Sequence, residues 1–188
     1  METREHILAV AQKLVQQRGF NGFSYADIAE EVGIRKASLH HHFSTKAELG
    51  VALMEDFTAQ LDREFLRINA MPGKADAKLN AYIAIFRGTL IADRMCMGGM
   101  LASEWLTLDR NMLPSLKLFF EHNVEWLTEV ISEGKAQKLF VLSEAASNHA
   151  RLLFSSLEGA LLIARVTGDK DAFDRTASLL ITGLTRKG

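Results

Sequence analysis

Three consecutive histidines, His40-His41-His42, are the first group in the chain whose type could do chemistry. Histidine binds metal ions and gains charge near physiological pH. On a helix, successive side chains point about 100° apart, so three adjacent histidines cannot easily close on one metal ion. A helical chelate needs ligands at i and i+4, and no His or Cys lies four residues from any of the three. The pattern favours contact with another molecule, and we expect no metal or other cofactor.

Cys96 is the second candidate for chemistry, and it is the only cysteine of the chain. A lone cysteine excludes an internal disulfide and suits a reducing cytoplasm. It follows Arg94 and precedes Gly98-Gly99, and nearby positive charge and helix-start amides favour a thiolate. Two interpretations stay open: a small buried hydrophobe, or a thiol that senses oxidants or electrophiles.

The composition limits the classes of protein to which these residues could belong. The net charge is −1, with 22 Lys and Arg against 23 Asp and Glu. This balance speaks against a nonspecific architectural DNA binder, because unspecific affinity depends on many phosphate contacts. No apolar run approaches the roughly 20 residues needed to cross a bilayer, and no secretory signal is visible. We expect a cytoplasmic protein without a membrane partner.

An enzyme is the other alternative. No H-E-x-x-H, G-x-S-x-G or P-loop motif is present, and Cys96 has no partner that the sequence makes evident. We therefore predict that the chain is not an enzyme, and we assign no catalytic residue.

The first fifty residues carry the pattern of three helices and the start of a fourth. Ile7, Ala11, Leu14 and Val15 form one apolar stripe, and Gly19 can end that helix. Residues 24–27, Ser-Tyr-Ala-Asp, have the form of a capping box and predict a second helix. Gly33 then supplies a tight turn. A third helix is expected over residues 35–43, and a second capping box at residues 45–48 opens a fourth.

Two short helices joined by a glycine-containing turn, braced by a first helix, are the layout of a helix-turn-helix DNA reader. Burying Leu39 and Phe43, four residues apart, leaves the opposite face of the third helix to solvent. Residues 33–49 carry Arg35, Lys36 and Lys46 against Glu48. Lys46 at a helix N-terminus would add its charge to backbone N–H donors, which suits a phosphate. The histidines then fit contacts to the groove and backbone of a duplex.

The same residues carry a family resemblance. The chain reads Ile28-Ala29-x-x-Val32-Gly33-Ile34-x-Lys36-Ala37-Ser38-Leu39-His40-His41-His42-Phe43-x-x-Lys46-x-x-Leu49, with Gly19-Phe20 upstream. Over about residues 5–50 this pattern resembles the N-terminal domain of TetR-family transcriptional regulators. The chain departs from the family pattern at Arg35, where Ser is common, at His40, where Tyr is common, and at Phe23, where Thr is common. The first two positions face DNA, so the operator sequence cannot be borrowed from relatives.

The resemblance implies roles for individual residues. Lys36, Ala37 and His40 match the positions that read bases. The positions that contact phosphates are matched by Ser24, Tyr25, His41, His42 and Lys46. Two of these have a structural alternative. Tyr25 could serve only in packing, and His42 could brace the fourth helix.

The remainder of the chain reads as helices throughout, which makes the protein all-α with about nine helices. Expected are a long helix over residues 46–68, helices over 75–92, 112–133, 143–166 and 170–186, and a short helix with Leu101, Trp105 and Leu108. The glycines of Met95-Cys96-Met97-Gly98-Gly99-Met100 are placed before that short helix, and Gly134 at the end of another. We divide the chain into a DNA-binding domain, residues 1–48, and a helical ligand-binding and dimerisation domain, residues 49–188.

This second part carries many bulky side chains, several of them flexible methionines. Such residues suit a pocket that adapts to small apolar ligands, and the resemblance also implies one. The pocket residues that we predict are Phe65, Phe86, Met95, Cys96, Met100, Leu101, Trp105, Phe120, Phe154 and Glu158. The alternative for each is ordinary core packing. Glu158 could also pair with Arg151 or Arg165 instead of anchoring a ligand.

The last two helices predict association with a second copy. Residues 145–164 contain many small side chains that allow helices to approach closely, and the family dimerises through the corresponding helices. The interface residues that we predict are Ala150, Leu153, Leu157, Ala160, Leu180 and Leu184. A two-fold dimer matches a palindromic operator with half-sites roughly 34–36 Å apart or a multiple of that spacing.

Together these patterns predict a homodimeric DNA-binding transcriptional regulator. The family's commoner habit implies a repressor, released from a palindromic operator when a small apolar or electrophilic inducer binds. Sensing of oxidants or electrophiles through Cys96 is the alternative. A small helical enzyme and a nonspecific architectural DNA binder are less favoured.

Overall fold

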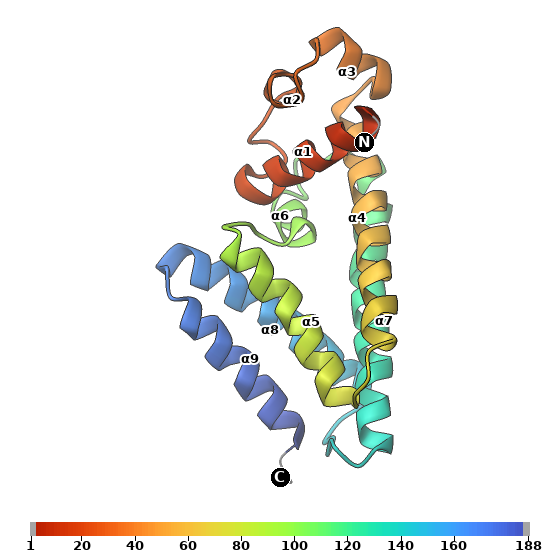
Figure 1. Cartoon of the computed structure of the whole chain (residues 1–188), viewed down its shortest axis with the longest axis vertical. Coiled ribbons are helices and arrows are strands. Elements are labelled where there is room, and N and C mark those ends of the chain that lie inside the picture. The colour runs from red at the N-terminus through yellow and green to blue at the C-terminus, as the bar shows by residue number, and fades with distance from the viewer. Residues whose placement is uncertain (1–2, 186–188) are drawn as a thin grey trace. The chain divides into compact units, whose positions relative to one another are not determined.

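The computed structural model describes residues 3–185, and within that range it contains nine α-helices, one short 3-10 helix and no strand (Figure 1). The prediction of an all-α chain with about nine helices is confirmed. No helix within these residues has both the length and the apolar character needed to cross a bilayer. The helices are α1 (Thr3–Arg18), α2 (Tyr25–Val32), α3 (Lys36–His42), α4 (Lys46–Asn69), α5 (Ala75–Ile91), α6 (Met97–Ser103), η1 (Arg110–Met112), α7 (Leu113–Ala136), α8 (Ala146–Thr167) and α9 (Lys170–Thr185).

The chain divides into two compact units. The first comprises residues Met1–Leu61 and Arg94–Phe119, and the second comprises Asp62–Asp93 and Phe120–Gly188. Helices α4 and α7 contribute residues to both units. The functional boundary at residue 48 falls in the first turn of α4, and it stays a prediction because compactness is a different criterion.

Short-range signals fix the helices of the first unit. Helix α1 ends at Arg18, and Gly19 follows with a left-handed φ of 82°, which an L side chain rarely adopts. Ser24 caps α2: its hydroxyl accepts from the amide of Ala26, and the carboxylate of Asp27 accepts from the amide of Ser24 at 2.7 Å. The Ser24 hydroxyl also donates to the Asp27 carboxylate at 2.6 Å, and this bond, followed by the bond from the Ser24 amide, lowers the pKa of Asp27. The predicted capping box is confirmed.

The core of the first unit joins α1, α2, α3 and the start of α4. Apolar side chains at most 3% exposed include Ile7, Ala11, Leu14, Val15, Ile28, Leu39, Phe43 and Leu49. Most of these are the residues of the predicted stripes. Burial of each large apolar side chain contributes about 1.5–3 kcal/mol to the stability of the fold before entropy is counted. The burial of Leu39 and Phe43 in this core therefore fixes the orientation of α3.

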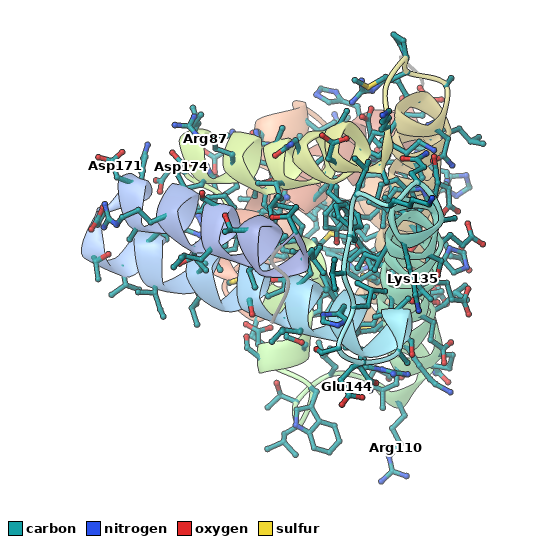
Figure 2. All side chains as sticks on the ribbon, turned by 90° about the horizontal axis from the view of Figure 1, so that it is seen from below. Arg87, Arg110, Lys135, Glu144, Asp171 and Asp174 are labelled. Carbon is teal, nitrogen blue, oxygen red and sulfur yellow. The ribbon has the colours of Figure 1, made fainter. Side chains whose placement is uncertain are left out.

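The second unit packs α5, α8 and α9 together with parts of α4 and α7. Tyr82 is fully buried, and its hydroxyl donates to the side-chain oxygen of Asn123 at 2.7 Å. At the surface Arg87 of α5 and Asp174 of α9 point toward one another (Figure 2) and form a two-pronged ion pair with Nε 2.8 Å from Oδ1. The hydrogen bonds and charge of Asp174 raise the pKa of Arg87.

Three predicted helix boundaries are wrong. Helix α6 begins inside the Met-Cys-Met-Gly-Gly-Met stretch and ends before Trp105. Gly98 lies within this helix, against the ring of Phe119, where a Cβ would lie 2.3 Å from the ring. Helix α7 continues through Gly134 to Ala136, and the left-handed residue that follows it is Lys138, with a φ of 61°. Helix α8 begins at Ala146 instead of residue 143.

Candidate functional site

Helix α3 presents one face to solvent and buries the other. Gly33 adopts a left-handed φ of 78° and turns the chain between α2 and α3, and the amide of Ile34 donates to the carbonyl of Ala29 at 3.0 Å. Leu39 is fully buried and Phe43 is 3% exposed. The exposed residues of the helix are Lys36, Ala37, Ser38, His40, His41 and His42. The structure therefore brings the predicted base-reading residues to the surface of one short helix.

Tyr25 holds α3 in place through its hydroxyl and its ring. It is 6% exposed, and its hydroxyl lies within donating distance of the carbonyls of Phe43, at 3.0 Å, and Thr45, at 2.7 Å. Its ring packs on the His40 ring with centroids 4.8 Å apart. Burial, and then the charge of Glu48, raise the pKa of Tyr25 to about 12. The prediction that Tyr25 contacts phosphate is corrected: its hydroxyl is committed to the backbone, and the packing alternative accounts for it.

The three histidines do not converge. The His40 Nδ1 lies 3.4 Å from the carbonyl of Ser44, whereas the rings of His41 and His42 meet edge to face with centroids 5.9 Å apart. His42 also lines a groove beside the first turns of α4. No group of three or more His, Cys, Asp or Glu side chains within residues 3–185 could hold a metal ion. The histidines are spread around the end of α3, as contacts to an extended partner would require.

Lys46 opens α4 with its charge turned toward the link between α1 and α2. Its ammonium donates to the carbonyl of Phe23 and lies over the rings of Phe20 and Phe23, 4.9 and 4.3 Å from their centroids. Burial lowers the pKa of Lys46, and the charges of Glu104 and Asp27 oppose that shift. Its predicted phosphate contact stays a prediction, and the structure gives it a further part in holding the link.

The turn between α3 and α4 is capped from both sides. Thr45 accepts from the amide of Glu48 at 3.1 Å, as a capping box requires. The carboxylate of Glu48 instead accepts from the amide and hydroxyl of Ser44, one residue before the cap, at 2.9 and 2.8 Å. Those bonds lower the pKa of Glu48. Ser24, another predicted phosphate contact, is exposed at the cap of α2.

Arg4 is a residue of this region that the sequence patterns did not single out. Its guanidinium lies over the ring of Phe43, 5.2 Å from the centroid, and it lines the same groove as His42. A lone arginine in the first turn of a helix has no motif to mark it. Its position adds a positive charge beside the end of α3.

Four of the predicted pocket residues gather in the second unit. Phe65 stacks on Trp126, with centroids 4.5 Å apart and planes 5° apart, and Tyr82 lies between Phe65 and Phe86. Phe154 contacts both Phe86 and Phe120. We call this set, Phe65, Tyr82, Phe86, Phe120, Trp126 and Phe154, the ring cluster. The pocket prediction missed Tyr82, although it lies on the apolar stripe of its helix.

The other predicted pocket residues have mixed environments. Met95, Cys96 and Leu101 are buried around α6 in the first unit, and Met100 is half-buried. Trp105 is 57% exposed, so its assignment to a pocket is corrected: it follows α6 in a turn and not on the helix face. In the second unit, Glu158 is half-buried on α8, and Arg165 pairs with Asp93 at 3.6 Å.

Four of the six predicted dimer residues face the interior of their own chain. Ala150, Leu153, Leu157 and Leu184 are at most 4% exposed within the single chain. Ala160 and Leu180 are half-buried. The exposed apolar residues of α8 and α9 are Leu152, Leu162, Ile163, Val166 and Leu179. Both faces of α8 are apolar in sequence, and contact with α5 and α9 decides which face is covered.

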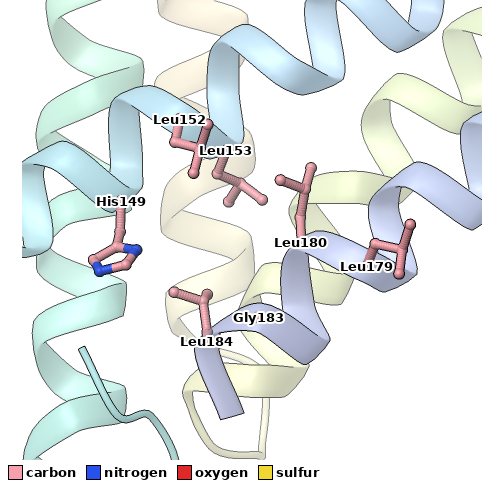
Figure 3. A pocket seen from close by; sticks show the side chains of 7 residues that line it. All are labelled: His149, Leu152, Leu153, Leu179, Leu180, Gly183 and Leu184. Atoms are coloured by element: carbon pink, nitrogen blue, oxygen red, sulfur yellow. The ribbon is translucent and has the colours of Figure 1, made fainter. Parts of the chain in front are cut away.

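A groove between α8 and α9 opens beside these exposed residues (Figure 3). Leu152 and Leu153 of α8 and Leu179, Leu180 and Leu184 of α9 line it, together with Gly183. His149 also borders the groove, and its Nε2 is buried without a hydrogen-bond partner. Leu152 and Leu179 are therefore both exposed and part of this apolar groove.

Comparison with known proteins places these features in a family. Residues 7–53 match the family described as "Bacterial regulatory proteins, tetR family". Over 174 residues the chain is 23% identical to the HTH-type transcriptional repressor NemR of Escherichia coli, covering 88% of this chain and 85% of NemR.

Solved structures give higher identity over nearly the whole length. A TetR-family transcriptional regulator from Agrobacterium tumefaciens superposes with a TM-score of 0.93 at 32% identity, and 98% of each chain is covered. A TetR transcriptional regulator from Legionella pneumophila gives a TM-score of 0.90 at 33% identity with the same coverage. With its helix-turn-helix and its exposed α3 face, this chain belongs to the TetR family of DNA-binding transcriptional regulators.

Proposed function

We propose that this chain is a ligand-responsive repressor that binds a palindromic operator as a homodimer through α3. The observation that carries the proposal is the division of α3 into a dry side, Leu39 with Phe43 beyond it, and an exposed side. Lys36, Ala37 and His40 share the exposed side. An α-helix fits the major groove, where base edges present distinct donor and acceptor patterns. Lys36 suits guanine acceptors, and His40 can donate or accept.

The phosphate contacts that we propose flank this face. His41 and His42 are exposed at the end of α3, and Ser24 is exposed at the start of α2. The ammonium of Lys46 has three N–H donors, so it can keep its bond to the Phe23 carbonyl and turn another donor toward a phosphate at the N-terminus of α4. The relatives named as repressors, NemR and the DhaR protein of Mycobacterium sp., support a repressor over an activator.

The experiment that tests DNA recognition is selection of binding sites from a random-sequence duplex pool. The proposed function predicts that the recovered sites share a two-fold symmetric motif with half-sites about one helical turn apart or a multiple. Recovery of sequences without a common motif would favour an architectural role. Recovery of no duplex at low salt would revive the enzyme alternative.

The homodimer that we propose uses the exposed side of α8 and α9. Leu152, Ile163 and Val166 follow one side of α8, separated by 11 and 3 residues in the sequence, and Leu179 extends the surface onto α9. Gly159 lies between them, where an added Cβ would meet no neighbouring atom within 4 Å. Exposed apolar side chains separated by small residues suit close helix packing against a second copy.

We also propose that the boundary between the DNA-binding domain and the ligand-binding and dimerisation domain lies between residues 48 and 49.

The ring cluster is the site at which we propose the inducer binds. Most of its rings are buried and pack on one another, and the indole N–H of Trp126 is buried among them without an acceptor. A buried donor without a partner costs free energy, so a ligand with an aromatic body and one acceptor atom would complement it. Binding would favour one geometry of the DNA heads over another, as a population shift requires.

Cys96 supports a second form of regulation. It stands at the N-cap of α6 and is 8% exposed. The preceding residue, Met95, donates its backbone amide to the carbonyl of Gln16 in α1. Alkylation or oxidation of the thiol would enlarge a buried side chain and displace the start of α6. Substitution Cys96→Ser should then abolish the loss of DNA affinity that an electrophile causes, and an unchanged response would exclude this form.

A further inference from the structure

The end of α6 is bonded to the link between α1 and α2. Glu104 is the C-cap residue of α6, and its carboxylate oxygen Oε2 accepts from the backbone amide of Asn21 at 3.1 Å. The side-chain amide of Asn21 donates in turn to the hydroxyl of Thr107 at 2.8 Å. Two hydrogen bonds thus join segments that are more than eighty residues apart in the sequence. Glu104 and Asn21 belong to the same compact unit.

The link is shaped to receive this carboxylate. Gly19 begins the link with a left-handed φ of 82°, and a Cβ on Gly19 would lie 2.3 Å from the Glu104 oxygen Oε1. The other oxygen of the same carboxylate takes the Asn21 amide. The carboxylate therefore lies against the backbone of the link and not beside it in solvent. Any larger residue at position 19 would push it away.

Lys46 holds the same link from the side of α4. Its ammonium donates to the carbonyl of Phe23, the last residue before the cap of α2, and lies over the ring of Phe20 near the start of the link. The negative charge of Glu104 acts favourably on this ammonium. Glu104 and Lys46 thus act on one short segment. That segment sets how α2 and α3 leave α1.

Helix α6 is also tied to α1 at its other end. The amide of Met95, two residues before α6, donates to the carbonyl of Gln16 at 2.9 Å. Because both ends of α6 are bonded to α1 or its link, α6 cannot shift along α1 without breaking one of these bonds or moving the link. The contact at Glu104 is the one that reaches the DNA reader.

Resting on the proposed function, we infer that Glu104 is a positioning residue through which the conformation of α6 and the binding of DNA by α3 are coupled. When α6 keeps its place, the carboxylate holds the link, and the link holds α2, α3 and Lys46 in the geometry that binds a duplex. When α6 moves, the bond to the Asn21 amide breaks and the reader loosens. Coupling between two sites is reciprocal, so bound DNA must also hold α6.

Cys96 provides the measurement, because it is the only thiol of the chain and starts α6. The rate at which N-ethylmaleimide alkylates Cys96 is measured with and without a saturating amount of the duplex selected by the wild-type chain. We expect bound duplex to slow alkylation about fivefold or more in the wild type. In Glu104→Ala at saturating duplex, we expect the two rates to be equal. Glu129→Ala, which removes an exposed glutamate from α7, should keep the wild-type ratio.

The ratio of rates separates positioning from stability. A Glu104 that only stabilised the fold would lower the melting temperature on substitution and leave the ratio unchanged, which would overturn the inference. A ratio of one in a wild-type chain that binds DNA would overturn it as well. Failure of the wild-type chain to bind any duplex would overturn the proposed function and the inference with it. If Glu104→Ala does not fold, Glu104→Met, which keeps the length of the side chain and removes the carboxylate, is expected to make the two rates equal as well, and a wild-type ratio in that variant would overturn the inference.

Discussion

The hydroxyl of Tyr25 donates to the carbonyl of Thr45 at 2.7 Å and so joins the first turn of α2 to the residue that caps α4. The same hydroxyl lies 3.0 Å from the carbonyl of Phe43. Helix α3 lies between these two points and has only seven residues. A helix of that length is not stable by itself, so Tyr25 and the buried Leu39 hold it in place.

The first prediction concerns alkaline pH. The pKa of Tyr25 in the folded chain is raised from 10.0 to about 12, first by burial and then by Glu48. The folded chain therefore holds this proton more tightly than the unfolded chain. Its contribution to stability is fully present below pH 10 and is lost as pH rises toward 12. Urea unfolding between about pH 9 and 11.5 should show wild-type stability falling more steeply than that of Tyr25→Phe. Parallel curves would contradict this assignment.

The second prediction concerns Lys46. Lys46→Ala should weaken binding to every duplex, and the slope of log K against log salt should become shallower by about 0.9. It should also lower the melting temperature, because the ammonium and its stem hold Phe20 and Phe23. Lys135→Ala, at an exposed position of α7, is the control and should leave the affinity, the salt slope and the melting temperature unchanged. Loss of affinity for one operator alone would contradict the phosphate role.

The third prediction concerns the histidines. His40, His41 and His42 are all exposed at the end of α3. Because each ring offers a nitrogen that can bond a base or a phosphate, replacing all three with Ala should weaken binding of the selected duplex about tenfold or more at constant pH and salt. Lys135→Ala should bind that duplex as the wild type does. A triple variant with wild-type affinity would exclude a role for these rings.

The fourth prediction concerns self-association. Leu152→Asp or Ile163→Asp should turn the dimer into a monomer in sedimentation at micromolar concentration, because a carboxylate would be buried in the interface without a partner. Leu66→Asp is the matched control: Leu66 is 69% exposed on α4, away from the α8 and α9 surface, and its substitution should leave the dimer intact. A monomeric wild type at that concentration would refute the dimer.

Much of the fold could be predicted from local signals. The capping residues Ser24 and Thr45 and the left-handed Gly19 and Gly33 each act within one helical turn, so the sequence alone places the corresponding helix ends. The exposed face of α3 followed from the spacing of Leu39 and Phe43.

The site residues that were mistaken depend on contacts between distant segments. Tyr25 could be a phosphate ligand or a core residue until the carbonyls of Phe43 and Thr45 are placed beside it. Both faces of α8 are apolar, so periodicity cannot tell Leu153, which faces its own chain, from Leu152, which faces solvent. Glu104 and Asn21 carry no motif at all, because their bond spans more than eighty residues.

The central claim is that the exposed side of α3 reads base sequence. The measurement that tests it most directly is a fluorescence anisotropy titration of the selected duplex and of a scrambled duplex with Lys36→Ala/His40→Ala. We predict that this variant, with a wild-type melting temperature, loses at least about fivefold of its preference for the selected site. Lys135→Ala should keep that preference. An undiminished preference in the double variant would contradict the assignment of α3 as the reading helix.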